Sequence, residues 1–286
     1  MATFDGKAPL GRRAVLVGGA ALLAGCATSG AGGPGTGAGG GQFVRREGTR
    51  FTIGGETYRF AGANMWYAAY LGADAPYGNR DRLRRELDRL RDLGVTNIRI
   101  LASSETSPLR GAISPSFRDT STAYSETLLG GLDYALAEMA RRGMRAVLYL
   151  TNFWEWSGGM MTYLSWTNGG RYLNMNDPAH PWPEFPDMTS GFYANDQAVG
   201  LYHHYVGALV GRTNGITGRA YADDPTIMSW QLANEPRPGG GEAVGMRNMP
   251  AYQAWIAALF ALPTASPPRG RGSLASCQDM IAGSSQ

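Results

Sequence analysis

Apolar residues follow two different periods along this chain, and the two periods alternate. The segment from Val95 to Leu101 is short and rich in Val, Ile and Leu, as expected of a strand. Between Asp81 and Leu93, leucines recur at helical spacing among Arg, Glu and Asp. Gly94 follows this helical segment, and Gly143 follows the next one, as glycine often does where helices end. The pattern therefore predicts strands that alternate with helices.

The same alternation extends over most of the chain. Strands are predicted at Tyr58 to Asn64, Val95 to Leu101, Arg145 to Asn152 and Thr226 to Ala233, and helices at Asp81 to Leu93, Ser125 to Arg142, Asn195 to Thr213 and from Ala251 onward. A long insertion rich in Trp, Gly and Pro separates the third strand from the third helix. Phe51 to Phe60 predicts two short strands joined at Gly54-Gly55, a hairpin that would cap the bottom of a barrel.

Strands that alternate with long helices favour a parallel sheet, which leaves a doubly wound sheet or a (β/α)8 barrel. No Gly-x-Gly-x-x-Gly loop follows the first strand, and this argues against a dinucleotide-binding fold. Polar and aromatic residues gather instead where the predicted strands end, at Asn64, Arg99, Asn152 and Asn234-Glu235. Barrel enzymes build their active sites at that face, so the barrel is favoured.

The first residues have the anatomy of an export signal. Arg12 and Arg13 precede an apolar run, and small residues lead to Cys26 as in a lipobox. Residues 1–26 are therefore predicted to be a lipoprotein signal peptide, with export by either the Sec or the twin-arginine route. Acylation of Cys26 would make the protein a membrane-anchored lipoprotein, in contact with the membrane only through its lipid; the alternative is an extracellular protein. The Gly/Ala-rich residues 27–42 are predicted to be a flexible linker.

Composition narrows the class of ligand. The chain has 286 residues, of which 43% are hydrophobic, so it can bury a substantial core. Its formal net charge is only +3, and no concentrated basic face indicates a nucleic-acid partner. Fourteen Tyr and seven Trp beside 17% charged residues suit a neutral, hydroxylated ligand. The two cysteines form no metal-binding pattern, and neither a metal nor another cofactor is expected.

Four motifs together resemble the family 5 glycoside hydrolases of clan A. They are Gly62-Ala63-Asn64-Met65-Trp66-Tyr67, Asn97-Ile98-Arg99, Asn152-Phe153-Trp154-Glu155-Trp156 and Trp230-Gln231-Leu232-Ala233-Asn234-Glu235-Pro236, each at the end of a predicted strand. The aromatic-rich third motif looks closest to the endo-β-1,4-mannanases. The resemblance implies a (β/α)8 TIM barrel of the glycosidase type, of which residues 43–257 would supply about the first four β/α units.

The resemblance also implies roles for individual residues. Glu235 would be the catalytic general acid/base, which protonates the glycosidic oxygen and later deprotonates water. Asn234 would bind the 2-hydroxyl of the substrate, and Arg99, Trp66 and Trp154 would also belong to the substrate-binding site. The other tryptophans of the insertion, Trp156 and Trp166, are candidate sugar platforms or loop-packing residues.

The pattern breaks after the fourth strand. A retaining glycosidase needs a second carboxylate about 5 Å from the first, and the resemblance places it at the end of a seventh strand. After Glu235 the only acidic residues are Glu242 and Asp279. Residues 258–286 are rich in Pro, Arg and Gly and predict an aberrant tail, as in a frameshifted gene. The chain is therefore expected to be inactive as written.

Three functional alternatives remain open. The favoured reading is retaining endo-hydrolysis of β-1,4-mannosidic bonds in mannan, galactomannan or a related plant polysaccharide. An endo-β-1,4-glucanase would share the acid/base motif, and a lipid-anchored polysaccharide-binding protein would need no turnover. The open half-barrel could also self-associate, because strand edges without partners recruit other strands.

Overall fold

The computed structural model describes residues 41–260. The predicted signal peptide with Cys26, the predicted linker up to residue 40 and the predicted tail from residue 261 onward lie outside the described residues. The strands are β1 Arg45–Glu47, β2 Arg50–Ile53, β3 Glu56–Thr57, β4 Ala61–Asn64, β5 Val95–Leu101, β6 Arg145–Tyr149 and β7 Ile227–Gln231. The α-helices are α1 Ala68–Gly72, α2 Arg80–Asp92, α3 Glu126–Arg141, α4 Gly159–Thr167, α5 Glu184–Thr189, α6 Asp196–Val210 and α7 Glu242–Phe260. Three short 3-10 helices are η1 Glu155–Ser157, η2 Ser190–Ala194 and η3 Tyr221–Asp223.

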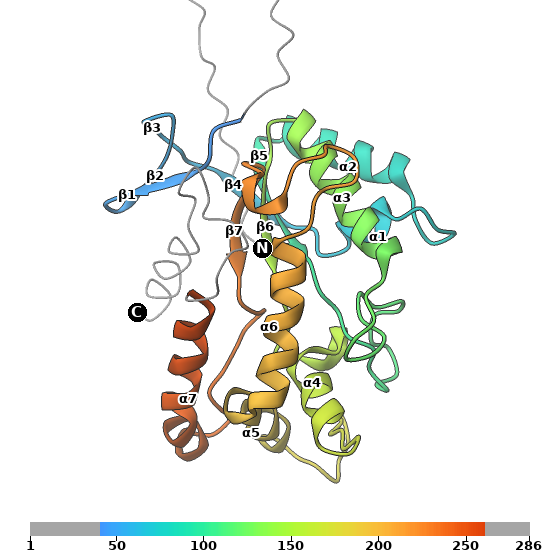
Figure 1. Cartoon of the computed structure of the whole chain (residues 1–286), viewed down its shortest axis with the longest axis vertical. Coiled ribbons are helices and arrows are strands. Elements are labelled where there is room, and N and C mark those ends of the chain that lie inside the picture. The colour runs from blue at the N-terminus through green and yellow to red at the C-terminus, as the bar shows by residue number, and fades with distance from the viewer. Residues whose placement is uncertain (1–40, 261–286) are drawn as a thin grey trace, which may run out of the picture. The chain divides into compact units, whose positions relative to one another are not determined.

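A four-stranded parallel sheet, in the order β4-β5-β6-β7, organises the fold (Figure 1). Its register pairs Asn64 with Arg99, Leu101 with Tyr149, and Tyr149 with Gln231. The predicted alternation of parallel strands and helices is confirmed, and the bounds of β5 agree with the sequence. Because all four strands run in the same direction, their carboxyl ends meet at one edge of the sheet.

A separate antiparallel sheet, in the order β1-β2-β3, precedes it. The predicted hairpin at Gly54-Gly55 is present, and both glycines have positive φ (62° and 87°), as a tight two-residue turn requires. The third strand, β1, was not predicted. Arg145 Nη2 donates to the carbonyl of Gln42 at 3.1 Å, so the segment that leads into the hairpin lies at the amino-terminal end of β6.

Several boundaries differ from the predicted ones. β4 begins three residues later than Tyr58, and β6 ends at Tyr149 because the following residues turn into the third loop. α7 begins at Glu242, before the predicted start at Ala251, and it passes through Pro250. It also runs past Ala258, where the aberrant tail was expected. Among residues 41–260, no helix is both long and apolar enough to cross a bilayer.

Helices α1 and α3 approach each other closely because two glycines leave room for backbone. A Cβ added to Gly72 would lie 2.2 Å from the carbonyl oxygen of Gly131, and one added to Gly131 would lie 2.1 Å from that of Ala69. A Cβ added to the neighbouring Gly130 would have no heavy atom within 4 Å. The close contact between the two helices is therefore specific to one side of α3.

This geometry predicts opposite effects of alanine at adjacent positions. Gly131→Ala is expected to lower the free energy of unfolding by about 1–3 kcal/mol, because the methyl group collides with backbone that cannot yield locally. Gly130→Ala is expected to raise it by about 0.5–1 kcal/mol, since alanine restricts the unfolded chain and suits a helix. Chemical denaturation of both variants measures the difference. Equal effects would contradict the close approach.

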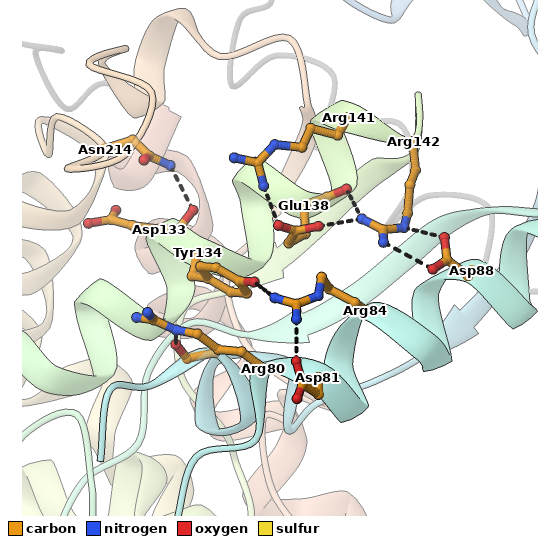
Figure 2. A network of polar contacts seen from close by, with 11 residues as sticks. Arg80, Asp81, Arg84, Asp88, Asp133, Tyr134, Glu138, Arg141, Arg142 and Asn214 are labelled. Carbon is orange, nitrogen blue, oxygen red and sulfur yellow. Dashed lines mark hydrogen bonds and ion pairs between the residues drawn. The ribbon is translucent and has the colours of Figure 1, made fainter.

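A polar network joins α2 to α3 on the outside of the sheet (Figure 2). Arg142 Nε donates to Asp88 at 2.8 Å, and Arg142 Nη1 donates to Glu138 at 2.5 Å. The side chain of Glu138 is only 5% exposed, and it also pairs with Arg141. Arg84 donates to the hydroxyl of Tyr134 at 2.6 Å. A nearly buried carboxylate needs such partners, so this network fixes how α2 packs against α3.

Candidate active site

The polar residues predicted at the strand ends lie on adjacent strands at one edge of the parallel sheet. Arg99 lies on β5, Asn152 follows β6, and Asn234 and Glu235 follow β7. Pairing continues past the regular strands, since the amide of Asn234 donates to the carbonyl of Thr151 at 2.8 Å. The last paired residue of this ladder is therefore directly followed by Glu235.

Arg99 is held by three groups. Its Nε donates to Gln231 Oε1 at 2.6 Å, its Nη2 donates to Asn234 Oδ1 at 2.9 Å, and its guanidinium lies 4.1 Å from the ring centre of Tyr149. Burial lowers the pKa of Arg99, while electrostatic interactions with Tyr149 and Glu235 oppose that shift. Since an arginine remains protonated even so, Arg99 supplies a fixed positive charge at this edge.

Asn234 has its amide orientation set from both ends. Its Oδ1 accepts from Arg99, and its Nδ2 donates to Asn152 Oδ1 at 3.0 Å. Asn152 in turn donates to Ser157 Oγ at 2.9 Å. An amide nitrogen carries two N–H groups, so the second one of Asn234 can donate to a ligand hydroxyl.

Glu235 adopts an unusual backbone conformation. Its φ is 46°, the only positive φ of a non-glycine residue among residues 41–260. Such conformations cost about 1–3 kcal/mol and gather at functional sites. The side chain is exposed, and its Oε2 accepts a 2.6 Å hydrogen bond from Trp154 Nε1. Oε1 is the carboxylate oxygen left to meet a substrate.

An aromatic group surrounds Trp154. The ring of Phe185 stacks on it with centroids 6.1 Å apart, and that of Trp182 stacks with centroids 6.4 Å apart. The guanidinium of Arg237 lies 5.1 Å from the ring centre of Trp154. Trp182 and Phe185 belong to the long insertion, and Arg237 follows the Asn-Glu-Pro motif. Sequence reasoning assigned no role to these three residues.

The other predicted tryptophans lie in different surroundings. Trp66 is half-buried and packs edge-to-face on Trp156 with centroids 5.9 Å apart, which joins the first loop to the third. Trp166 lies on α4, where the guanidinium of Arg118 is 4.9 Å from its ring centre. Because Arg118 is fully buried, this contact places one face of Trp166 toward the core. Of the candidate platforms, Trp154 is the one bonded to Glu235.

The loop that carries Asn152 and Trp154 rests on Glu105. Glu105 Oε2 accepts from the amide of Gly159 at 2.8 Å, and the amide of Glu105 donates to the carbonyl of Ser157 at 2.9 Å. The carboxyl group is completely buried, and burial raises its pKa. Gly159 approaches so closely that an added Cβ would lie 2.2 Å from the carbonyl oxygen of Asn152.

Two further carboxylates, Glu105 and Glu155, follow strands at this edge, but both are buried and accept hydrogen bonds from backbone amides. Glu105 is bound as described, with Ser103 Oγ donating to its other oxygen at 2.7 Å. Glu155 is 1% exposed, its Oε1 accepts from the amide of Met175 at 3.0 Å, and burial raises its pKa. Neither has the exposed position of Glu235. No cluster of three potential metal ligands occurs among residues 41–260.

Comparison with known proteins identifies the family to which the chain belongs. A family profile described as glycoside hydrolase family 5 β-mannosidase-like matches residues 41–263. The chain is 35% identical over 198 residues to the putative mannan endo-1,4-β-mannosidase 9 of Oryza sativa subsp. japonica, an alignment that covers 69% of this chain and 43% of that protein. It is 30% identical over 226 residues to mannan endo-1,4-β-mannosidase 7 of Arabidopsis thaliana, which covers 77% and 46%.

Solved structures agree with this assignment. The glycoside hydrolase family 5 mannosidase from Rhizomucor miehei superposes with a TM-score of 0.64 at 33% identity, covering 74% of this chain and 55% of that one. The four β/α units thus correspond to about half of a family 5 TIM barrel, and the chain spans less than half the length of these curated relatives. The chain belongs to the β-mannosidase-like group of glycoside hydrolase family 5.

Proposed function

We propose that the carboxyl edge of the sheet binds β-1,4-linked mannan and that Glu235 is the general acid/base for retaining endo-hydrolysis of the mannosidic bond. The observation that carries this proposal is the arrangement around Glu235: its carboxylate is bonded to Trp154 and directly follows Asn234, which Arg99 holds in place. The mannan endo-1,4-β-mannosidase names of the curated relatives support the substrate class.

The geometry suits the acid step. A glycosidic oxygen leaves readily only when it is protonated, and Glu235 Oε1 is available for that transfer while Trp154 fixes Oε2. The second N–H of Asn234 is free to bind a hydroxyl of the sugar whose bond breaks, a contact that strengthens as positive charge develops on the ring. The positive charge of Arg99 holds Asn234 without competing for the proton.

Retaining hydrolysis also requires a nucleophilic carboxylate about 5 Å from the acid/base. Among residues 41–260, the other carboxylates that follow strands of the parallel sheet are Glu105 and Glu155, both buried and bonded to backbone amides. We therefore expect the 286-residue chain to bind mannan oligosaccharides and to release little reducing sugar.

Binding and turnover test the proposal separately. Isothermal titration calorimetry of the full chain should show tighter binding of β-1,4-mannohexaose than of cellohexaose. The reverse preference would favour an endo-β-1,4-glucanase instead, and the absence of binding to either would refute the proposed site.

The role of Glu235 is tested with Glu235→Gln, which keeps the shape of the side chain but carries no transferable proton. Any release of reducing sugar from galactomannan should fall at least about hundredfold, as is usual when an acid/base is removed. Binding of mannohexaose should persist. Release that is unchanged in the variant would contradict the role.

A further inference from the structure

An exposed tryptophan lies beside the proposed acid/base, on a segment with no assigned role. Trp182 is 59% exposed and belongs to the insertion between α4 and α5. Large exposed aromatic rings commonly mark a binding surface when they adjoin other aromatic groups. Trp182 meets that condition, because its ring stacks on Trp154 with an angle of 27° between the planes.

The stacked rings of Trp154 and Trp182 extend away from the carboxylate of Glu235. Trp154 Nε1 is bonded to Glu235 Oε2, and the centroid of Trp182 is 6.4 Å from that of Trp154. One aromatic ring therefore separates Trp182 from the carboxylate. Arg99 and Asn152 contact Asn234, whereas Trp182 is connected to Glu235 through Trp154. The two sets of contacts define two separate parts of the site.

The segment that carries Trp182 is fastened to the loop that carries Glu235. Asp187 Oδ1 accepts from the amides of Gly240 at 2.8 Å and Gly241 at 3.3 Å. An added Cβ on Gly240 would lie 2.7 Å from Pro183 Cβ and 2.3 Å from Pro186 Cγ, so the two loops are in close contact. A platform held in this way loses little conformational entropy when a ligand binds.

We propose that Trp182 is a stacking platform for a hexopyranose unit on the leaving-group side of the bond that Glu235 protonates. A general acid lies next to the leaving oxygen of the substrate. The stack of Trp154 and Trp182, which is hydrogen-bonded to Glu235 through Trp154, is therefore placed to bind the departing part of the polysaccharide. The apolar C–H face of a pyranose complements an exposed indole face. The ligand class is a neutral β-1,4-linked oligosaccharide long enough to extend beyond Trp154. This inference rests on the proposed function.

The experiment compares Trp182→Ala, Trp182→Phe and Phe60→Ala in the full chain by calorimetric titration with β-1,4-mannohexaose. Phe60 is a matched control, because it is 41% exposed and stacks on Tyr58 but directly precedes β4, at the amino end of that strand. Trp182→Ala should weaken binding about tenfold, as truncation of an aromatic anchor commonly does, and Trp182→Phe should retain most of the affinity. Phe60→Ala should bind like the unchanged protein.

The outcomes separate the two proposals. Unchanged affinity in Trp182→Ala, or an equal loss in Trp182→Ala and Phe60→Ala, would overturn the platform and leave the mannan site intact. Failure of the unchanged protein to bind mannohexaose would refute the proposed function itself. Binding of mannobiose, which is too short to occupy every unit of the site, should respond less to Trp182→Ala than binding of mannohexaose; an equal response to both would also overturn the platform.

Discussion

Arg118→Ala is expected to lower the free energy of unfolding by about 3–5 kcal/mol, the loss that follows when a buried charge loses its partner. Arg118 is fully buried, and its Nη1 donates to the hydroxyl of Tyr163 at 2.9 Å. Its guanidinium also lies 4.9–5.4 Å from the ring centres of four aromatic residues: Tyr124, Tyr163, Trp166 and Tyr205. Alanine would remove all these contacts at once.

The loss should also depend on pH. The positive charge of Arg118 lowers the pKa of Glu105, although burial raises it more. Without Arg118 the pKa of Glu105 would rise further above its unfolded value, and a carboxyl group with a raised pKa stabilises the fold at low pH and loses that contribution as the pH rises through the folded pKa. Arg118→Ala should therefore be more destabilising at pH 8 than at pH 5.

Urea denaturation at the two pH values measures both effects. Arg110→Ala removes an exposed arginine and should change stability by less than about 0.5 kcal/mol. Adding Glu105→Gln to Arg118→Ala should recover part of the loss at pH 8, since no charge is then buried alone. A loss below about 1 kcal/mol in Arg118→Ala, or one that does not change with pH, would count against the coupling.

Gly159→Ala should destabilise the protein by about 2–5 kcal/mol, far more than the same change at Gly169. Both glycines have positive φ (66° and 79°), so alanine costs about 1–2 kcal/mol at either position. At Gly159 the added Cβ would also lie 2.2 Å from the carbonyl oxygen of Asn152, which adds about 1–3 kcal/mol. At Gly169 no heavy atom lies within 4 Å of it.

The collision has a functional consequence, since Gly159 supports the loop that carries Asn152 and Trp154. We expect Gly159→Ala to weaken mannohexaose binding, measured by calorimetry at a temperature where the variant remains folded, while Gly169→Ala binds normally. Thermal unfolding followed by circular dichroism gives the stability of both variants. Similar values for the two would show that the loop can move to accommodate a methyl group.

Elements with strong local signals were predictable from the sequence. β5 is rich in Val, Ile and Leu and has the predicted bounds. Helices α2, α3 and α6 each begin after a capping side chain, on Asn79, Ser125 and Asn195. The short helices α4 and α5 lack a side-chain cap and were not predicted. They form inside the insertion because tertiary contacts with α6 and η2 hold them there.

Some residues of the candidate site were also predictable from the sequence, and others were not. Arg99, Trp154 and Asn234-Glu235 stand in motifs that resemble a known family, and the structure brings all four residues into one bonded group. Their roles remain predictions. Trp182 carries no such signal, because its position depends on contacts between segments distant in sequence. Arg237 could have been found from its place directly after Asn-Glu-Pro.

The left-handed backbone of Glu235 also bears on how this position can evolve. Glycine, asparagine and aspartate adopt that conformation more readily than glutamate. Replacement of Glu235 by any of these three residues would therefore relieve backbone strain and raise the stability of the fold. Only a requirement for a carboxylate of this length opposes such drift. Across a set of homologous genes, the residue at this position should therefore distinguish lineages under selection for catalysis from those in which that selection has lapsed.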